Sequence, residues 1–377
     1  MEKSRAWIEL DMKHLAHNVA EFKRMLPEDC KMMPAVKANA YGHGASEMAG
    51  ELQKLGIDAF CVASMEEGIE LRRDGIKGEI LVLGYTDPAA AKTLLDYQIT
   101  QTIIDEEYGK QLESYAAKEG GRLPVHIGVD TGMHRLGIPW DAHERLCAMW
   151  KLPHLEVRGV YSHLCVSDGE EEKEIAFTKT QIARFDETVA YLRTQIKKPF
   201  AVHLQGSYGV LNYPECHYDY ARVGIALYGI LSSRTLIPKS AKGLLPVLSL
   251  HSVITSIREL NPGEGAGYGL DFVAEKKSRI AAAAIGYADG IPRNLSGRGM
   301  ALLHGKRVPI VGRVCMDQLL LDVTGVPDAA PEDEVLFIGG QGAEKISAEE
   351  FAGWSDTISN EIVSRLGARL GRFVSEN

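Results

Sequence analysis

The sequence lacks the features that nucleic-acid-binding and membrane-spanning proteins need. Its 42 Lys and Arg residues are outnumbered by 51 Asp and Glu residues, which gives a formal net charge of -9, so the basic face of a nucleic-acid-binding protein is not expected. No apolar run approaches the roughly 20 residues of a membrane span. The polar start, Met1–Arg5, is unlike a signal peptide. These absences predict a soluble globular protein without a nucleic-acid partner.

Cysteine chemistry and a dinucleotide-binding fold are not indicated either. The six cysteines, at positions 30, 61, 147, 165, 216 and 315, are scattered and form no CxxC pair. The sequence therefore predicts neither a metal site nor a disulfide scaffold, and a reducing compartment such as the cytoplasm fits best. No GxGxxG motif follows the first expected strand, which weakens a Rossmann interpretation.

What the sequence does have is a regular alternation of strand-like and helix-like segments over about the first 230 residues. It begins with a strand at Trp7–Leu10 and a helix from Asp11, which suits an N-cap, to about Met25. A long helix is expected over Glu174–Thr194. About eight strands, each followed by a helix, predict an α/β fold of the (β/α)8 TIM-barrel type rather than an open sheet. The other strands are expected at Met32–Lys37, Ala59–Ala63, Ile80–Gly84, Thr100–Ile104, Leu123–Val129, Val157–Ser162, Phe200–Leu204 and Arg222–Ile225.

The pattern changes at roughly residue 240, where prolines and glycines begin to punctuate short β-rich runs. A last helix is expected at about Ser347–Leu370. We therefore predict a barrel domain at 1–240 and a mostly-β domain at 241–377, with residues 1–10 packing against the β-domain. The runs that predict its strands are Leu248–Ile257, Ser278–Ile285, Arg307–Val311, Leu319–Val323 and Val335–Ile338.

Lys37 is the most informative single residue. It ends the apolar run Met32–Val36 and is followed by small residues and glycines. Burying an ammonium costs several kcal/mol unless its pKa falls or it reacts. A desolvated, partly neutral amine is what capture of an aldehyde cofactor requires. The alternative is a strand-end lysine that extends to solvent.

The segment from Val36 to Gly44, Val-Lys-Ala-Asn-Ala-Tyr-Gly-His-Gly, resembles the pyridoxal-phosphate lysine motif of the alanine racemase family. The segments Val129–Gly137, Arg222–Gly229 and Val311–Gln318 also resemble motifs of that family, in the same order. The resemblance extends from Trp7 nearly to the C-terminus. It implies a homodimeric enzyme that uses pyridoxal 5'-phosphate and acts on a small amino acid.

The resemblance also implies roles for individual residues. Lys37 and Tyr268 would be the two catalytic bases, with Tyr268 acting across a dimer interface. Arg222 would face the pyridine nitrogen, and it can only donate a hydrogen bond there because an arginine does not lose its proton. The family's cofactor-binding positions fall on Lys37, Tyr41, Arg135, His163, Ser207, Arg222, Gly224 and Ile225. Its substrate-binding positions fall on Arg135, Met316 and Asn360, and its access corridor falls on Asp168, Tyr287, Arg293, Arg313 and Ile358.

Three positions depart from the family pattern. Gly128 stands where a carbamylated lysine usually orients the arginine, so an anion, another side chain or nothing supports Arg135. Gly206 replaces an asparagine, so the contact that this asparagine makes in the family is not expected here. Asn360 replaces a tyrosine; asparagine is smaller, offers a donor and an acceptor, and could bind a substrate hydroxyl.

The change at Asn360 makes the chain similar to the catalytic part of serine racemases of vancomycin-resistance systems, which follows a membrane domain. The sequence thus predicts a racemase of L- and D-serine and L- and D-alanine that supplies D-amino acids for peptidoglycan precursors. It would be cytoplasmic, or the cytoplasmic part of a membrane-bound protein. The alternatives are a barrel-type decarboxylase, expected to place an acid rather than Arg222 at the pyridine nitrogen, and a non-catalytic cofactor-binding protein.

Overall fold

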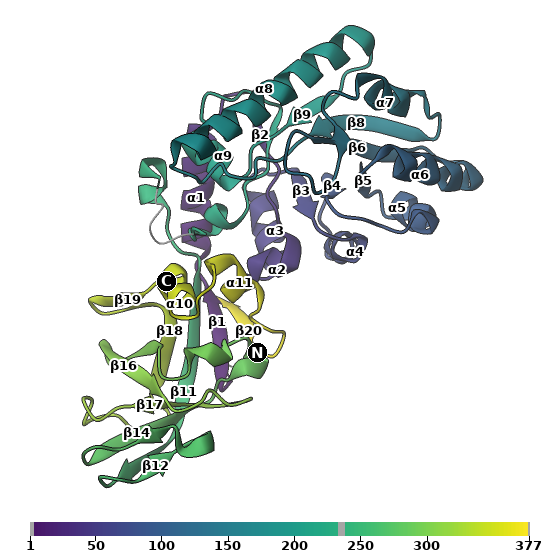
Figure 1. Cartoon of the computed structure of the whole chain (residues 1–377). Coiled ribbons are helices and arrows are strands. Elements are labelled where there is room, and N and C mark those ends of the chain that lie inside the picture. The colour runs from purple at the N-terminus through teal and green to yellow at the C-terminus, as the bar shows by residue number, and fades with distance from the viewer. Residues whose placement is uncertain (1–3, 233–237, 376–377) are drawn as a thin grey trace.

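The computed structural model describes residues 4–232 and 238–375, which form two parts (Figure 1). The upper part in that view is a barrel of parallel strands surrounded by helices. The lower part is a mostly β-stranded domain that carries both ends of the chain. This architecture confirms the predicted barrel with a C-terminal β-rich domain.

Eight parallel strands form the barrel, in the order β2-β10-β9-β8-β6-β5-β4-β3. A bridge between Ala35 and Cys61 joins the two ends of that order, so the sheet nearly closes on itself. The strands are β2 (Lys31–Met32), β3 (Ala59–Val62), β4 (Glu79–Val82), β5 (Thr100–Ile103), β6 (Leu123–Asp130), β8 (Leu155–Tyr161), β9 (Ala201–His203) and β10 (Tyr220–Ala221), with the short β7 (Ile138–Pro139) beside β6.

Amphipathic helices cover the barrel. In α1 (Met12–Met25), Leu15, Val19 and Phe22 are buried at helical spacing. The carboxylate of Asp11 accepts a hydrogen bond from the backbone N–H of His14 at 2.9 Å, which confirms the predicted N-cap. Among the helices of the described ranges, none combines the length and the hydropathy that crossing a membrane takes. Besides α1, the helices around the barrel are α3 (Ala45–Lys54), α4 (Met65–Arg73), α5 (Ala91–Asp96), α6 (Glu106–Glu119), α7 (His143–Ala148), α8 (Glu172–Gln195) and α9 (Ser207–Asn212).

The C-terminal part is built on a sheet in the order β19-β18-β15-β16-β17-β14-β11-β1-β20. Strand β1 comes from the start of the chain and lies between β11 and the edge strand β20, with which it pairs. The strands are β1 (Ala6–Leu10), β11 (Leu248–Leu260), β14 (Ser278–Ala283), β15 (Met300–Leu303), β16 (Lys306–Val311), β17 (Leu319–Asp322), β18 (Glu334–Gln341), β19 (Glu344–Ile346) and β20 (Gly371–Val374), with a separate pair β12 (Gly265–Ala266) and β13 (Phe272–Val273).

The sequence predicted a strand over Met32–Lys37, but β2 ends at Met32 and the chain does not continue as a strand to Lys37. It forms α2 (Lys37–Tyr41), whose last four residues have φ between +51° and +54°. We call this segment the left-handed turn. Non-glycine residues pay roughly 1–2 kcal/mol each for such a backbone. Three side chains hold it: Glu67 accepts from the N–H of Ala38 and Asn39 accepts from the N–H of Ala45, each at 2.7 Å. Nδ1 of His43 lies 2.9 Å from the carbonyl oxygen of Ala40 and 3.0 Å from that of Tyr41.

Two other predicted elements were wrong in extent. The expected helix Ser347–Leu370 is instead α10 (Ala348–Trp354) and α11 (Ser359–Ser364). They are separated because Asp356 has φ +52°, which a right-handed helix cannot contain. The expected strand Arg222–Ile225 is a loop that leads into a 3-10 helix at Ile225–Tyr228, because strand pairing ends at Ala221.

The short helix α11 connects the two parts of the molecule. A Cβ at Gly42, which has φ +82°, would lie 1.8 Å from the carbonyl oxygen of Val363, so only glycine lets α11 approach the left-handed turn. Arg372 donates to the carbonyl of Gly42 at 2.9 Å, and the hydroxyl of Ser359 donates to the carbonyl of Leu231. These contacts place Asn360 at the mouth of the barrel.

Candidate active site

A cavity of about 440 Å³ opens at the carboxyl ends of the barrel strands. Leu83 and Gly84, which follow β4, and Gly128, near the end of β6, are part of its wall. Barrels of this type build their active sites at this end. The cavity brings together ten of the residues that the sequence singled out: Lys37, Tyr41, Arg135, His163, Asp168, Ser207, Arg222, Gly224, Ile225 and Asn360.

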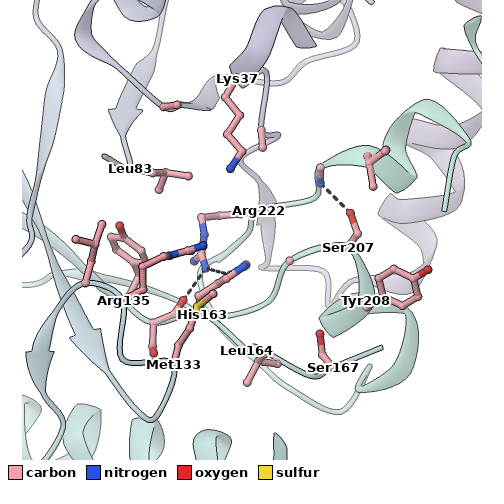
Figure 2. A pocket seen from close by; sticks show the side chains of 18 of the residues that line it. Lys37, Leu83, Met133, Arg135, His163, Leu164, Ser167, Ser207, Tyr208 and Arg222 are labelled. Carbon is pink, nitrogen blue, oxygen red and sulfur yellow. Dashed lines mark hydrogen bonds between the residues drawn. The ribbon is translucent and has the colours of Figure 1, made fainter. Parts of the chain in front are cut away.

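Lys37 supplies the reactive amine of the cavity. Figure 2 shows its side chain extending into the cavity with the amine towards Arg222. Burial lowers the pKa of this amine below its usual value, and the positive charge of Arg135 lowers it further. The amine is therefore more readily neutral than an exposed lysine, as a nucleophile or a base requires.

Arg222 lies at the floor of the cavity, 5% exposed. Its Nη2 donates to the carbonyl oxygens of Ser162 at 2.6 Å and Leu204 at 3.0 Å. Its Nη1 lies 2.7 Å from Nδ1 of His203, and its Nη2 lies 3.3 Å from Nδ1 of His163. The guanidinium is thus fixed in orientation and acts only as a donor.

His163 is held neutral. Burial lowers its pKa to about 3, and the nearby charges of Arg222, Arg135 and Lys37 act in the same direction. Because Nδ1 of a neutral ring can accept the hydrogen bond from Arg222, the other nitrogen carries the proton. A Cβ at Gly206 would lie 3.3 Å from Cε1 of His163, so the glycine leaves room for this ring.

Arg135 points into the cavity beside Arg222 (Figure 2). Within residues 4–232 and 238–375, no hydrogen bond or ion pair of its guanidinium to a protein group is found. A Cβ at Gly128 would lie 3.3 Å from the carbonyl oxygen of Ile103 and 3.5 Å from Cγ2 of Thr102. Gly128 has no side chain that could support the Arg135 guanidinium, and no other side chain in the described residues forms a hydrogen bond or an ion pair with it.

One side of the cavity forms a cradle suited to a phosphate. The Ser207 hydroxyl accepts from the backbone N–H of Gly224 at 3.0 Å and is 3.4 Å from that of Ala226 (Figure 2). A Cβ at Gly224 would lie 2.8 Å from the Tyr41 hydroxyl oxygen, so the absence of a side chain there opens the space. Backbone N–H groups at the start of a short helix, next to two hydroxyls, can bind an anion.

Asn360 enters the cavity from α11. Its Oδ1 is buried and accepts no hydrogen bond from the described residues. A buried amide oxygen without a donor is costly. This atom is therefore available to a donor on a bound molecule.

The other predicted site residues lie outside the cavity, on the C-terminal part: Tyr268, Met316, Tyr287, Arg293, Arg313 and Ile358. Tyr268 is 70% exposed, and Met316 and Ile358 are each 53% exposed. Tyr268 lies in the turn between β12 and β13, which contains Gly267 and Gly269 at φ +75°. The cavity of a single chain thus lacks these six side chains.

Sequence reasoning missed the aromatic and imidazole support beneath Arg222. The Tyr161 ring lies 4.8 Å from Cζ of Arg222 and stacks on His203 with ring centroids 4.9 Å apart. His126 contacts His203 from the other side. All three residues lie in expected barrel strands, but their positions in the sequence did not indicate that they contact one another.

The fold and the site define a class: a barrel protein with an added β-rich domain, whose cavity holds a lysine amine among cations beside an anion cradle. Models of the alanine racemase N-terminal domain and the alanine racemase C-terminal domain match residues 10–232 and 247–374. The chain belongs to the alanine racemase family.

Individual relatives agree with this assignment. An amino-acid racemase of Enterococcus faecalis is 39% identical over 98% of this chain. That relative is longer, and this chain spans only 51% of its length. An alanine racemase of Nostoc sp. is 38% identical over 98% of this chain and 95% of its own length. The crystal structure of alanine racemase from Bacillus anthracis with bound L-Ala-P has a TM-score of 0.92 and 33% identity, covering 100% of this chain and 96% of that one.

Proposed function

We propose that the chain is a pyridoxal-phosphate-dependent amino-acid racemase that interconverts the L and D forms of serine and alanine. The observation that carries this proposal is the Lys37 amine, with its lowered pKa, facing the fixed donor Arg222 across a cavity with an anion cradle. A relative from Enterococcus gallinarum, 38% identical over 97% of this chain, is a serine/alanine racemase; the chain spans 51% of that protein.

The residues of the cavity fit the cofactor. Lys37 would hold its aldehyde carbon, and the N–H groups of Gly224 and Ile225 with the hydroxyls of Ser207 and Tyr41 would bind its phosphate. The space above Gly224, which a Cβ would fill, is evidence for this fit. When bound, pyridoxal phosphate withdraws electrons and so acidifies the Cα–H of an attached amino acid.

The two arginines of the cavity would bind and orient the cofactor and the substrate. Arg135, without a protein acceptor, is free to bind the phenolic oxygen of the cofactor and the carboxylate of the substrate. Arg222 donates towards the pyridine nitrogen and cannot transfer a proton to it. An unprotonated ring withdraws electrons less strongly, which suits a reaction that returns the proton to the same carbon.

Two bases on opposite faces of Cα would invert the centre. The Lys37 amine would take or return the proton on one face, and the partner subunit's Tyr268 would do so on the other. The backbone N–H of the partner subunit's Met316 would bind the substrate carboxylate. A tyrosine that is 70% exposed in one chain gains such a role only when a second chain covers it.

A homodimer is supported by exposed apolar side chains on the C-terminal part, which also carries Tyr268. Leu270, Val273, Met316 and Ile358 are also more than half exposed, between 51% and 62%. Exposed apolar side chains that gather on one part of a surface mark interaction sites. The access corridor, formed by Asp168 with Tyr287, Arg293, Arg313 and Ile358, would be completed across this interface.

Serine is favoured as a substrate because of Asn360. Its buried Oδ1 has no donor, and a serine hydroxyl would provide one. A site that pairs with a hydroxyl discriminates strongly against substrates that lack it. A racemase with this preference would supply D-serine and D-alanine for peptidoglycan precursors, in the cytoplasm or on its membrane, as in vancomycin-resistance systems.

A decarboxylase of the same architecture is the second candidate. It needs a stronger electron sink and hence an acid at the pyridine nitrogen, whereas the group at the cavity floor is Arg222. A protein that only binds the cofactor would not need the C-terminal part that carries Tyr268.

The decisive experiment incubates the chain and pyridoxal phosphate with L-serine and L-alanine side by side. Formation of the D-amino acids without CO2 release is expected. Lys37→Ala should lose both this activity and the visible absorption of lysine-bound cofactor. Persistence of the absorption band in Lys37→Ala would show that Lys37 is not the anchor, and CO2 release would favour the decarboxylase.

A further inference from the structure

A line of buried polar side chains runs from Arg222 down the inside of the barrel. Nδ1 of His203 is 2.7 Å from Nη1 of Arg222. Nε2 of His203 is 2.8 Å from Nδ1 of His126. Nε2 of His126 is 3.1 Å from Oε1 of Glu79, at ion-pair distance, although its N–H is not aligned with that oxygen. We call these four residues the histidine chain.

The protons of the histidine chain can be assigned from its two ends. Arg222 can only donate, so Nδ1 of His203 must accept and its proton must lie on Nε2. That proton is donated to Nδ1 of His126, so the proton of His126 also lies on Nε2, facing Glu79. A carboxylate can only accept. Every contact then has one donor and one acceptor, and the opposite direction would set two donors or two acceptors against each other.

The barrel is built around this chain. The side chains of His126 and His203 are fully buried. Gly159 of β8 is opposite His126 of β6, and a Cβ at Gly159 would lie 2.5 Å from Cε1 of the His126 ring. The glycine therefore makes the space that this imidazole fills. The Tyr161 ring stacks on the His203 ring, with centroids 4.9 Å apart and an interplanar angle of 16°.

Glu79 lies at the opposite end of the barrel from the cavity. It is the first residue of β4, whereas Leu83 and Gly84, just beyond the last residue of β4, line the cavity. Its side chain is 19% exposed. In the described residues, no carboxylate forms an ion pair with Arg222, so Glu79 is the anion to which this buried cation is connected. The Thr100 hydroxyl donates to the same carboxylate oxygen at 3.1 Å.

We propose that Glu79 is a positioning residue for Arg222: it fixes the proton positions of His126 and His203 and thereby holds the guanidinium as a donor towards the cavity. The proposal rests on the proposed function only in that Arg222 would meet the cofactor's pyridine nitrogen. Glu79 touches neither the cavity nor a bound group. Its effect passes through two neutral imidazoles.

The protonation of the two histidines is measured directly in the full chain without cofactor, so this test does not depend on turnover. Long-range 1H–15N NMR spectra of 15N-histidine-labelled protein should show His126 and His203 neutral, with the proton on Nε2 in both. Single His126→Gln and His203→Gln variants would assign the signals. A proton on Nδ1 of either ring, or a doubly protonated ring, would overturn the proposal.

Glu79→Leu tests the link to Arg222. Removing the acceptor should shift the signals of both histidines and lower kcat about tenfold, the lower end of what loss of an outer hydrogen-bond partner costs a ligating histidine, with KM changed less than about twofold. Glu79→Gln keeps an acceptor oxygen and should restore the histidine signals and most of kcat. Thr100→Val is the matched control, because it removes the hydrogen bond from Thr100 to Glu79 but leaves His126 untouched.

Unchanged histidine signals and unchanged kcat in a folded Glu79→Leu protein would refute the proposal. If Glu79→Leu does not fold, the wild-type histidine protonation and the Glu79→Gln protein still decide it. If the histidine signals respond as expected but no racemisation is detected in any protein, the proposed function fails and the assignment of the histidine chain stands.

Discussion

Replacing Gly224 with alanine should weaken the binding of pyridoxal phosphate without unfolding the chain. The added methyl carbon would lie 2.8 Å from the hydroxyl oxygen of Tyr41 and 3.4 Å from its Cζ. Tyr41 has little room to move, because its ring packs against the buried Tyr228 with centroids 5.9 Å apart. Because the phenol cannot move aside freely, the added methyl group distorts the proposed cradle, and the proposed hydrogen bond from Tyr41 to the phosphate is lost. Since a hydrogen bond to a charged group contributes about 1.5–3 kcal/mol, Kd should rise roughly 10- to 160-fold.

Titration of the cofactor-free protein with pyridoxal phosphate, followed by absorbance, gives this Kd. Tyr41→Phe should cause a similar loss without crowding. Gly50→Ala is the matched control, because a Cβ at Gly50, in α3, would have no other atom within 4 Å. A Gly224→Ala protein that binds the cofactor within about twofold of wild type would refute the assignment of the cradle.

Three further predictions concern other parts of the molecule. Tyr268→Phe should keep cofactor absorbance and suppress racemisation in both directions; unchanged turnover would exclude the two-base assignment. Asn360→Tyr should shift the ratio of kcat/KM towards alanine, and an unchanged ratio would remove the reason for preferring serine. Burial lowers the pKa of His43 from 6.5 to about 4. As the pH falls, His43 is therefore protonated in the unfolded chain before it is protonated in the folded chain. About 3 kcal/mol of the free energy of unfolding that is present above pH 6.5 is lost by pH 4. Denaturant unfolding of His43→Phe should show a shallower loss over that range, whereas an identical slope would contradict it.

The barrel could be predicted because its strands are short apolar runs between amphipathic helices, and most of the cavity because its residues lie in recognisable motifs. The left-handed turn could not, since Ala38 to Tyr41 contains no glycine and nothing local marks a positive φ. The break between α10 and α11 depends on the backbone of Asp356, which the apolar spacing of the surrounding residues concealed.

The histidine chain escaped prediction for a different reason. His126 and His203 are 77 residues apart, and Glu79 lies on a third strand. Only the register of the closed barrel brings the three side chains into line. Position in a motif gave no indication of this, because their contacts are with one another and not with a ligand.

The left-handed turn connects Lys37 and Tyr41, the two residues that we propose bind opposite ends of the cofactor. Lys37 at its start and Tyr41 at its end are positioned by four residues that adopt the mirror image of their favoured helix. The chirality of these residues favours the right-handed form, and the hydrogen bonds to Glu67, Asn39 and His43 are among the contacts that oppose it. Weakening either the Glu67 or the Asn39 hydrogen bond would favour the right-handed backbone and move the Tyr41 phenol away from Gly224, so we expect the proposed contact with the phosphate to weaken.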